Sequence, residues 1–111
     1  MRNGFANRAY CVETLYKYCK TLWGGHTPTI IFYKKDILKL PKSDRYRASN
    51  IKKLYGAYYD ESDTIYINIR NHRNRAHLKS TIAHELLHRM DPDIHHGRMF
   101  DNVVTILTAL A

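Results

Sequence analysis

The pentapeptide His84-Glu85-Leu86-Leu87-His88 constrains the fold of this chain more than any other feature of its 111 residues. Its two histidines are four positions apart, so on a helix they project from the same face, with Cβ atoms about 5–6 Å apart. Both imidazoles can then reach one Zn²⁺ ion at about 2.0–2.1 Å. The carboxylate of Glu85 can reach a water on that metal and take its proton. The pattern therefore predicts a helix that carries a hydrolytic zinc site.

The sequence around the motif predicts a helix over residues 75–90. An apolar side chain recurs every four positions there, as in a stripe that faces a core: Leu78, Ile82, Leu86 and Met90. Polar side chains share the side that lies off this stripe: His77, Thr81, His84 and His88. Asp91-Pro92 ends the helix just past the second histidine, because proline cannot continue it.

The rest of the chain predicts an α+β fold in one domain over residues 1–111. Amphipathic spacing predicts an N-terminal helix over 5–22, with one apolar face: Ala9, Val12, Leu15, Tyr16, Cys19 and Leu22. A polar stretch over 36–54 predicts a loop or a short helix, and a last helix is expected over 97–110.

Three runs rich in β-branched and aromatic residues predict strands at 29–33, 55–59 and 64–69. Turn residues at 60–63 separate the second and third runs, which predicts a β-hairpin. We therefore expect helices packed on one face of a small, mostly antiparallel sheet.

A hydrolytic zinc site needs three protein ligands and an open position for water, so a ligand beyond the pentapeptide is required. The candidates follow the helix: Asp91, Asp93, His95, His96 and Asp101. Aspartates in a turn more often cap a helix or bond locally, and the last helix contains no glutamate. Chemistry alone therefore favours a histidine and does not choose between His95 and His96.

The pentapeptide followed by His96-Gly97-Arg98-Met99-Phe100 resembles the SprT-like zinc metallopeptidases, which pair HExxH with a later H-G-x-x-F. The resemblance implies that the metal ligands are His84, His88 and His96, and that Glu85 is the catalytic base. It also implies a minimal zincin-like fold, in which the strand before the HExxH helix, here 64–69, forms the edge of the substrate cleft. A peptide could add to that edge as a further strand.

The spacing departs from that family in one respect, since the gap between His88 and His96 is shorter than SprT-like proteins usually show. It comes nearer to the close spacing of metzincins and of WLM peptidases. Asp91, however, stands where the metzincin glycine should be, and Ile94 where its third histidine should be. We expect no zinc ribbon or other accessory domain after the motif.

The charge balance is basic, with 18 Lys and Arg against 10 Asp and Glu, a net charge of +8. Most of the excess falls between residues 34 and 79, where tyrosines are interleaved with basic residues: Lys34, Lys35, Lys39, Lys42, Arg45, Arg47, Lys52, Lys53, Arg70, Arg73, Arg75 and Lys79. Phosphate contact and base stacking need such groups, so the 34–79 region is a candidate nucleic-acid surface. The alternative is a solvated face whose tyrosines lie half in the core.

The two cysteines and the lack of long apolar runs bear on the compartment. On a helix over 5–22, Cys11 and Cys19 lie about 12 Å apart along the axis, too far for a disulfide. The chain contains no apolar run near the roughly 20 residues that span a bilayer, and its first residues lack a long apolar segment. We therefore expect a cytoplasmic protein that does not contact membranes.

Together these features predict a zinc-dependent endopeptidase that hydrolyses peptide or protein substrates by a metal-activated water, with Glu85 as the general base. The basic region suggests substrates associated with nucleic acid. The alternative is a basic nucleic-acid-binding module with a structural or vestigial zinc site, which would lack an open coordination position beside Glu85. A zinc endoribonuclease is disfavoured, because its familiar motif has glycine where this chain has Glu85.

Overall fold

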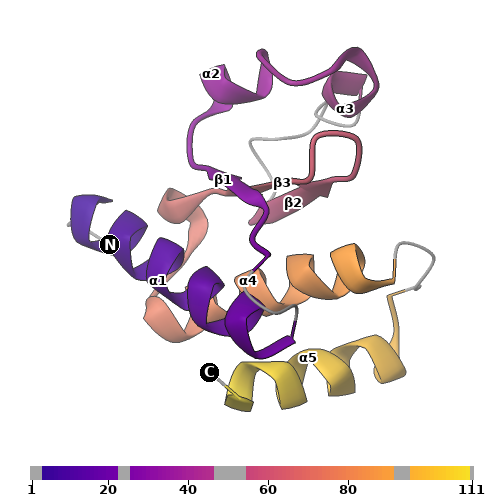
Figure 1. Ribbon diagram of the computed structural model, residues 1–111. Coiled ribbons are helices and arrows are strands. Elements are labelled where there is room, and N and C mark those ends of the chain that lie inside the picture. The colour runs from indigo at the N-terminus through magenta and orange to yellow at the C-terminus, as the bar shows by residue number, and fades with distance from the viewer. Residues whose placement is uncertain (1–3, 23–25, 47–54, 92–95, 111) are drawn as a thin grey trace.

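The computed structural model of the chain describes residues 4–22, 26–46, 55–91 and 96–110. In chain order the elements are α1 (Gly4–Leu22), β1 (Thr29–Ile31), α2 (Lys34–Ile37), α3 (Lys42–Tyr46), β2 (Gly56–Tyr59), β3 (Thr64–Ile67), the 3₁₀ helix η2 (Ile69–Asn71), α4 (Arg75–Met90) and α5 (Arg98–Leu110) (Figure 1). The predicted helices, strands and hairpin are confirmed to within a few residues. None of these helices combines the length and the apolar character that a membrane span requires.

The three strands form one mixed sheet in the order β1-β3-β2. β2 and β3 pair antiparallel as a hairpin, with Gly56 opposite Ile67, whereas β1 pairs parallel to β3, with Thr29 opposite Thr64. The expectation of a mostly antiparallel sheet is therefore wrong in this part of the chain. The placement of 64–69 at the edge of the cleft is also wrong. β1 pairs with one side of β3 and β2 pairs with the other, which makes β3 the central strand.

Helices cover both faces of the sheet, not the single face that the sequence predicts. α1, α4 and α5 lie on one side in Figure 1, and their apolar side chains form the main core with Ile65 and Ile67. On the other side Ile37 of α2 packs against Tyr59 and Tyr66 in a second, smaller cluster. Neighbouring residues of β3 point to opposite faces, so all four of its residues are buried.

The buried face of α1 is rotated from the predicted one. The residues that face the core are Asn7, Cys11, Thr14, Leu15, Tyr18 and Cys19. Val12 and Tyr16, which the sequence places in the core, are exposed, since apolar residues occur on both sides of this helix. Both cysteines are buried as free thiols, in agreement with the expectation that they do not form a disulfide.

A polar contact holds the end of α4 against the hairpin turn. The Arg89 guanidinium donates from Nε to Asp63 Oδ1 at 2.8 Å and from Nη2 to Asp63 Oδ2 at 3.0 Å. The Tyr58 hydroxyl donates to the same carboxylate at 2.8 Å. Arg89 follows directly after His88, so this two-pronged ion pair fixes the end of the motif helix relative to the sheet.

Candidate metal centre

Helix α4 presents the two motif histidines on the side that lies off the core. The helix begins after Asn74, whose side-chain oxygen accepts from the His77 N–H at 2.9 Å. Three of the four predicted stripe residues are buried (Leu78, Ile82 and Leu86), whereas Met90, the last residue of the helix, is 50% exposed. This packing fixes the rotation of α4, which leaves His84 and His88 half-buried beside its core face.

The structure brings the third predicted histidine to the same point. His96 lies just before α5, and its Nε2 atom is 3.2 Å from Nε2 of His84 and 3.0 Å from Nε2 of His88. The Nε2 atoms of His84 and His88 are themselves 3.3 Å apart. The ligands implied by the resemblance therefore form one compact triangle of nitrogen atoms.

This triangle can hold a metal ion. In a tetrahedral site with metal–nitrogen distances of 2.0–2.1 Å, two ligand atoms lie about 3.3–3.4 Å apart, close to the separations found here. A neutral imidazole carries one N–H and has a lone pair on its other ring nitrogen, so three converging Nε2 atoms can offer three lone pairs to one cation. The spacing and the donor type both fit a metal bound by three imidazoles.

Burial favours the neutral, metal-binding form of the two helix histidines. The pKa of His84 is lowered to about 4, first by burial and then by His88 and His96. The pKa of His88 is also lowered, first by burial and then by His96. Neutral imidazoles have a free lone pair, which metal binding requires.

The other candidate third ligands do not join this group among the described residues. Asp91 is the C-cap of α4, and its N–H donates to the Leu87 carbonyl. Asp101 lies in the first turn of α5, and its charge partly offsets the lowering of the His84 pKa. Asp93 and His95 lie outside the described residues.

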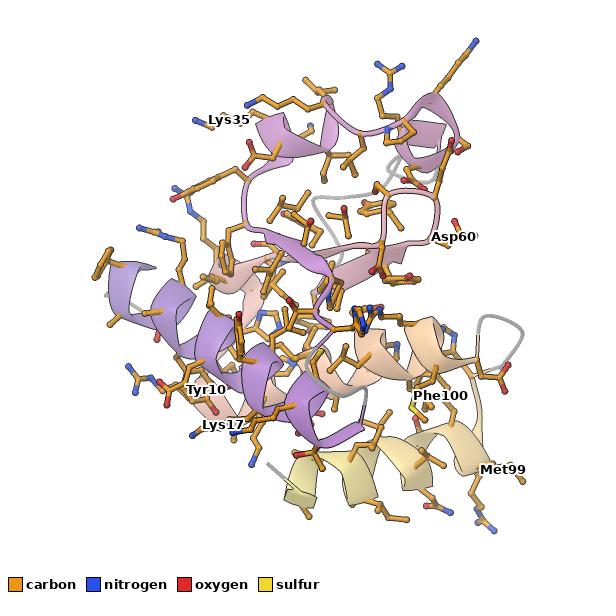
Figure 2. The ribbon with its side chains drawn as sticks, viewed as in Figure 1. Tyr10, Lys17, Lys35, Asp60, Met99 and Phe100 are labelled. Carbon is orange, nitrogen blue, oxygen red and sulfur yellow. The ribbon has the colours of Figure 1, made fainter. Side chains whose placement is uncertain are left out.

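Phe100 supports the three histidines from below. Its ring centroid lies 4.5 Å from that of His84, 4.9 Å from that of His88 and 4.8 Å from that of His96. The side chain is completely buried, and Figure 2 shows it between α4 and α5. The sequence places Phe100 in the last helix and at the phenylalanine of the H-G-x-x-F pattern, but neither shows that its ring contacts all three imidazoles.

Glu85 is the buried carboxyl of the site. Burial raises its pKa from 4.5 to about 8, so the carboxyl takes up a proton far more readily than an exposed glutamate does. A carboxyl that gains and loses a proton near neutral pH is suited to general base chemistry.

A cavity of about 330 Å³ opens beside Glu85, between the start of β2 and the polar side of α4. Its lining residues are Tyr55, Gly56, His77, Ser80, Thr81, His84 and Glu85. The sequence places His77 and Thr81 on the side of His84, and the cavity confirms that placement. The sequence does not indicate that Tyr55 or Gly56 lines the cavity. These two residues reach the site because β2, not β3, is the edge strand next to α4.

No family model, no curated protein and no solved structure matches this chain. The inference that the site binds metal therefore rests on the three converging nitrogens, and the inference of catalysis rests on Glu85 and the cavity beside it.

Among the described residues of the basic region, the tyrosines do not all lie at the surface. Tyr59 and Tyr66 are buried in the cluster around Ile37, as the alternative interpretation of the sequence has it. Tyr33 is 46% exposed, and two cations lie over its ring: Lys35 Nζ at 5.4 Å and Arg8 Cζ at 5.7 Å from the centroid. In Figure 2, Lys35 and Phe100 lie on opposite sides of the sheet, so Lys35 is on the other side of the sheet from the ring that contacts the histidines. Residues 47–54 lie outside the described part of the chain.

Proposed function

We propose that this chain is a zinc-dependent endopeptidase of SprT-like type, with His84, His88 and His96 as metal ligands and Glu85 as the general base. The observation that carries the proposal is the triangle of three Nε2 atoms at 3.0–3.3 Å, with a buried carboxyl on the next residue of the same helix. Three protein ligands leave a fourth tetrahedral position for water or substrate, as in catalytic zinc sites. A structural site usually has four protein ligands, which disfavours the alternative of a structural zinc module.

Each residue of the site has a defined task in such a reaction. Bound zinc lowers the pKa of water to about 7 and polarises the carbonyl to be attacked. Glu85 accepts a proton from the attacking water and delivers it to the leaving amine. Phe100 holds the three imidazoles in place, and the cavity beside Glu85 gives space for a substrate group.

The main chain of the substrate pairs with β2 in this proposal, in place of the strand that the sequence assigned. β3 is hydrogen-bonded on both sides and cannot accept another strand. β2 pairs with β3 on one side, and its first residue lines the cavity next to Glu85. Strand addition uses main-chain hydrogen bonds and gives affinity without sequence specificity.

Zinc binding and catalysis are tested together with variants of the site and a matched control. Wild type and Glu85→Gln are expected to bind one zinc each, and only wild type is expected to cleave casein. Glu13→Gln changes an exposed glutamate of α1 and is expected to leave both properties unchanged. His96→Ala is expected to lose zinc. Cleavage by Glu85→Gln at the wild-type rate would show that the peptidase mechanism is wrong, and zinc binding without cleavage by wild type would favour the structural zinc module.

We propose further that the segment containing α2 and α3 directs the peptidase to proteins on nucleic acid. It carries five exposed basic residues, Lys34, Lys35, Lys39, Lys42 and Arg45, and Lys35 lies over the ring of exposed Tyr33. The probe is a single-stranded oligonucleotide, and its binding is measured by fluorescence anisotropy at several salt concentrations. Removing two phosphate contacts with Lys34→Ala and Lys35→Ala lowers the salt slope by about 1.4. Lys20→Ala on α1 is the control, and an equal slope for all variants would contradict this assignment.

A further inference from the structure

The cavity beside Glu85 is bounded at its far end by a cluster of three rings, Tyr55, His72 and His77. The ring centroids of His72 and His77 are 4.5 Å apart, and Tyr55 lies 4.8 Å from His77 and 5.4 Å from His72. Tyr55 and His77 line the cavity, and His72 packs behind them. The cavity is thus lined by His84 and Glu85 of the candidate metal centre and also by the rings of Tyr55 and His77, which form its aromatic wall.

Hydrogen bonds hold this wall in a fixed position. His72 is 2% exposed, and its Nδ1 donates to the Asn68 carbonyl at 2.7 Å. Its Nε2 is then left to accept from the Thr81 hydroxyl at 2.8 Å. Burial lowers the pKa of His72, which keeps the ring neutral in this arrangement. Asn68 in turn donates its N–H to the Tyr55 carbonyl at 2.9 Å, so the start of β2 is tied to α4 through this histidine.

The strand also lies unusually close to the helix at this point. A Cβ atom on Gly56 would lie 2.9 Å from Cγ2 of Thr81 and 2.8 Å from the Tyr66 carbonyl oxygen. The absence of a side chain at Gly56 therefore allows β2 to approach α4. The wall of the cavity is built into the packing of strand and helix.

The chemistry of the wall defines which side chain fits. Apart from Glu85 and the histidines, the lining residues carry no ionisable group except the Tyr55 phenol. Rings pair favourably with rings at centroid distances of 4.5–7 Å, an interaction that aliphatic side chains do not make. A volume of about 330 Å³ accommodates one large side chain, not a length of folded chain.

We propose that Tyr55 and His77 determine specificity by binding an uncharged aromatic side chain of one of the two substrate residues that flank the scissile bond. This inference rests on the proposed peptidase function, because the position of the side chain is defined relative to Glu85. The contribution of ring pairing corresponds to a preference of about 2- to 10-fold for an aromatic over an aliphatic side chain of similar size.

The activity test uses the full chain loaded with zinc and two peptides that differ only in Phe or Leu at the flanking position found in a peptide library. Wild type is expected to have a higher kcat/KM for the Phe peptide than for the Leu peptide. The ratio of these two values is expected to be about 2- to 10-fold lower in His77→Ala and in Tyr55→Ala than in wild type. His26→Ala, at an exposed histidine outside the cavity lining, is the control and leaves the ratio unchanged. Thermal melts confirm that each variant is folded.

A binding test needs neither metal nor turnover. Titration of the metal-free chain with N-acetyl-phenylalanine amide is expected to shift the NMR signals of Tyr55, His77 and Ser80 more than N-acetyl-leucine amide does. Two results would refute aromatic specificity at Tyr55 and His77 and leave the peptidase function supported. One is cleavage without an aromatic preference, and the other is a preference that His77→Ala and Tyr55→Ala leave intact. Shifts at the cavity without any peptide cleavage would support aromatic binding and refute the peptidase. Neither shifts nor cleavage would refute both.

Discussion

Replacing Phe100 separates support of the metal centre from support of the fold. The ring is completely buried and contacts His84, His88 and His96 at centroid distances of 4.5–4.9 Å. Phe100→Ala would remove about 3–5 kcal/mol of stability, a large part of the 5–15 kcal/mol typical of a domain. Phe100→Leu is the better change, because it keeps most of the volume and costs less than about 1.5 kcal/mol.

The expected effect of Phe100→Leu on zinc binding exceeds its effect on folding. Groups that orient metal ligands typically change metal affinity about 10- to 100-fold when they are removed, and tenfold equals about 1.4 kcal/mol. We expect a loss of zinc affinity near the lower end of this range, because a leucine still fills the space beneath the imidazoles but lets the rings rotate. Competition with a chromophoric chelator measures zinc affinity, and urea unfolding measures stability.

Leu107→Val provides the control on the same helix. Leu107 is also buried, and losing one methylene costs about 1 kcal/mol of stability. It makes none of the ring contacts that link Phe100 to the histidines, so zinc affinity is expected to remain at the wild-type value. If Phe100→Leu and Leu107→Val bound zinc equally tightly at matched stability, the ring would have no part in holding the imidazoles.

Three further changes test the fold and the site. Gly56→Ala places a Cβ 2.8 Å from a backbone oxygen and is expected to lower the unfolding free energy by about 1–3 kcal/mol, measured by urea unfolding. Burial alone would raise the pKa of Asp63, but hydrogen bonds from Arg89 and Tyr58 lower it overall, so its contribution is present above the unfolded pKa of about 3.9 and is lost as the pH falls through the folded value. Asp63→Asn should therefore be less stable than wild type by about 1 kcal/mol at pH 7, and the difference should vanish in acid; a constant difference would contradict the ion pair. Zinc at 100 times its Kd should stabilise the chain by about 2.7 kcal/mol, a rise in Tm of about 10 °C that a chelator reverses and that His84→Ala abolishes.

Local patterns in the sequence were enough to predict the elements and the placement of His84 and His88 on one side of a helix. The four-residue spacing of Leu78, Ile82 and Leu86 predicts α4, and their burial fixes which side of the helix carries the histidines. His96 was predicted through its resemblance to a known motif, since its approach to His84 depends on how the chain reverses between α4 and α5. The motif contains Phe100, but the contact of its ring with all three imidazoles depends on the same packing and could not be predicted.

Strand order was not predicted, because it depends on contacts between residues far apart in the chain. The hairpin of β2 and β3 is local, but the pairing of β1 with β3 is not. The composition of the strands does not reveal which is central, because all three lack a charged side chain: Thr29–Ile31, Gly56–Tyr59 and Thr64–Ile67. On α1, exposed Val12 and Tyr16 give the helix a second apolar side. Packing of α1 against α4 determines which of the two sides is buried.

The double pairing of β3 also orders the assembly of the sheet during folding. Its partner β2 is four residues away, across 60–63, whereas β1 is 32 residues away, across 32–63. An eightfold longer loop costs about 2 kcal/mol more in closure entropy, so the hairpin is expected to form before β1 docks. Until then β3 presents an unpaired edge that carries Ile65 and Ile67, the kind of edge through which chains aggregate. A chain that lost α1 and β1 would keep that edge open permanently, although all three histidines would be present.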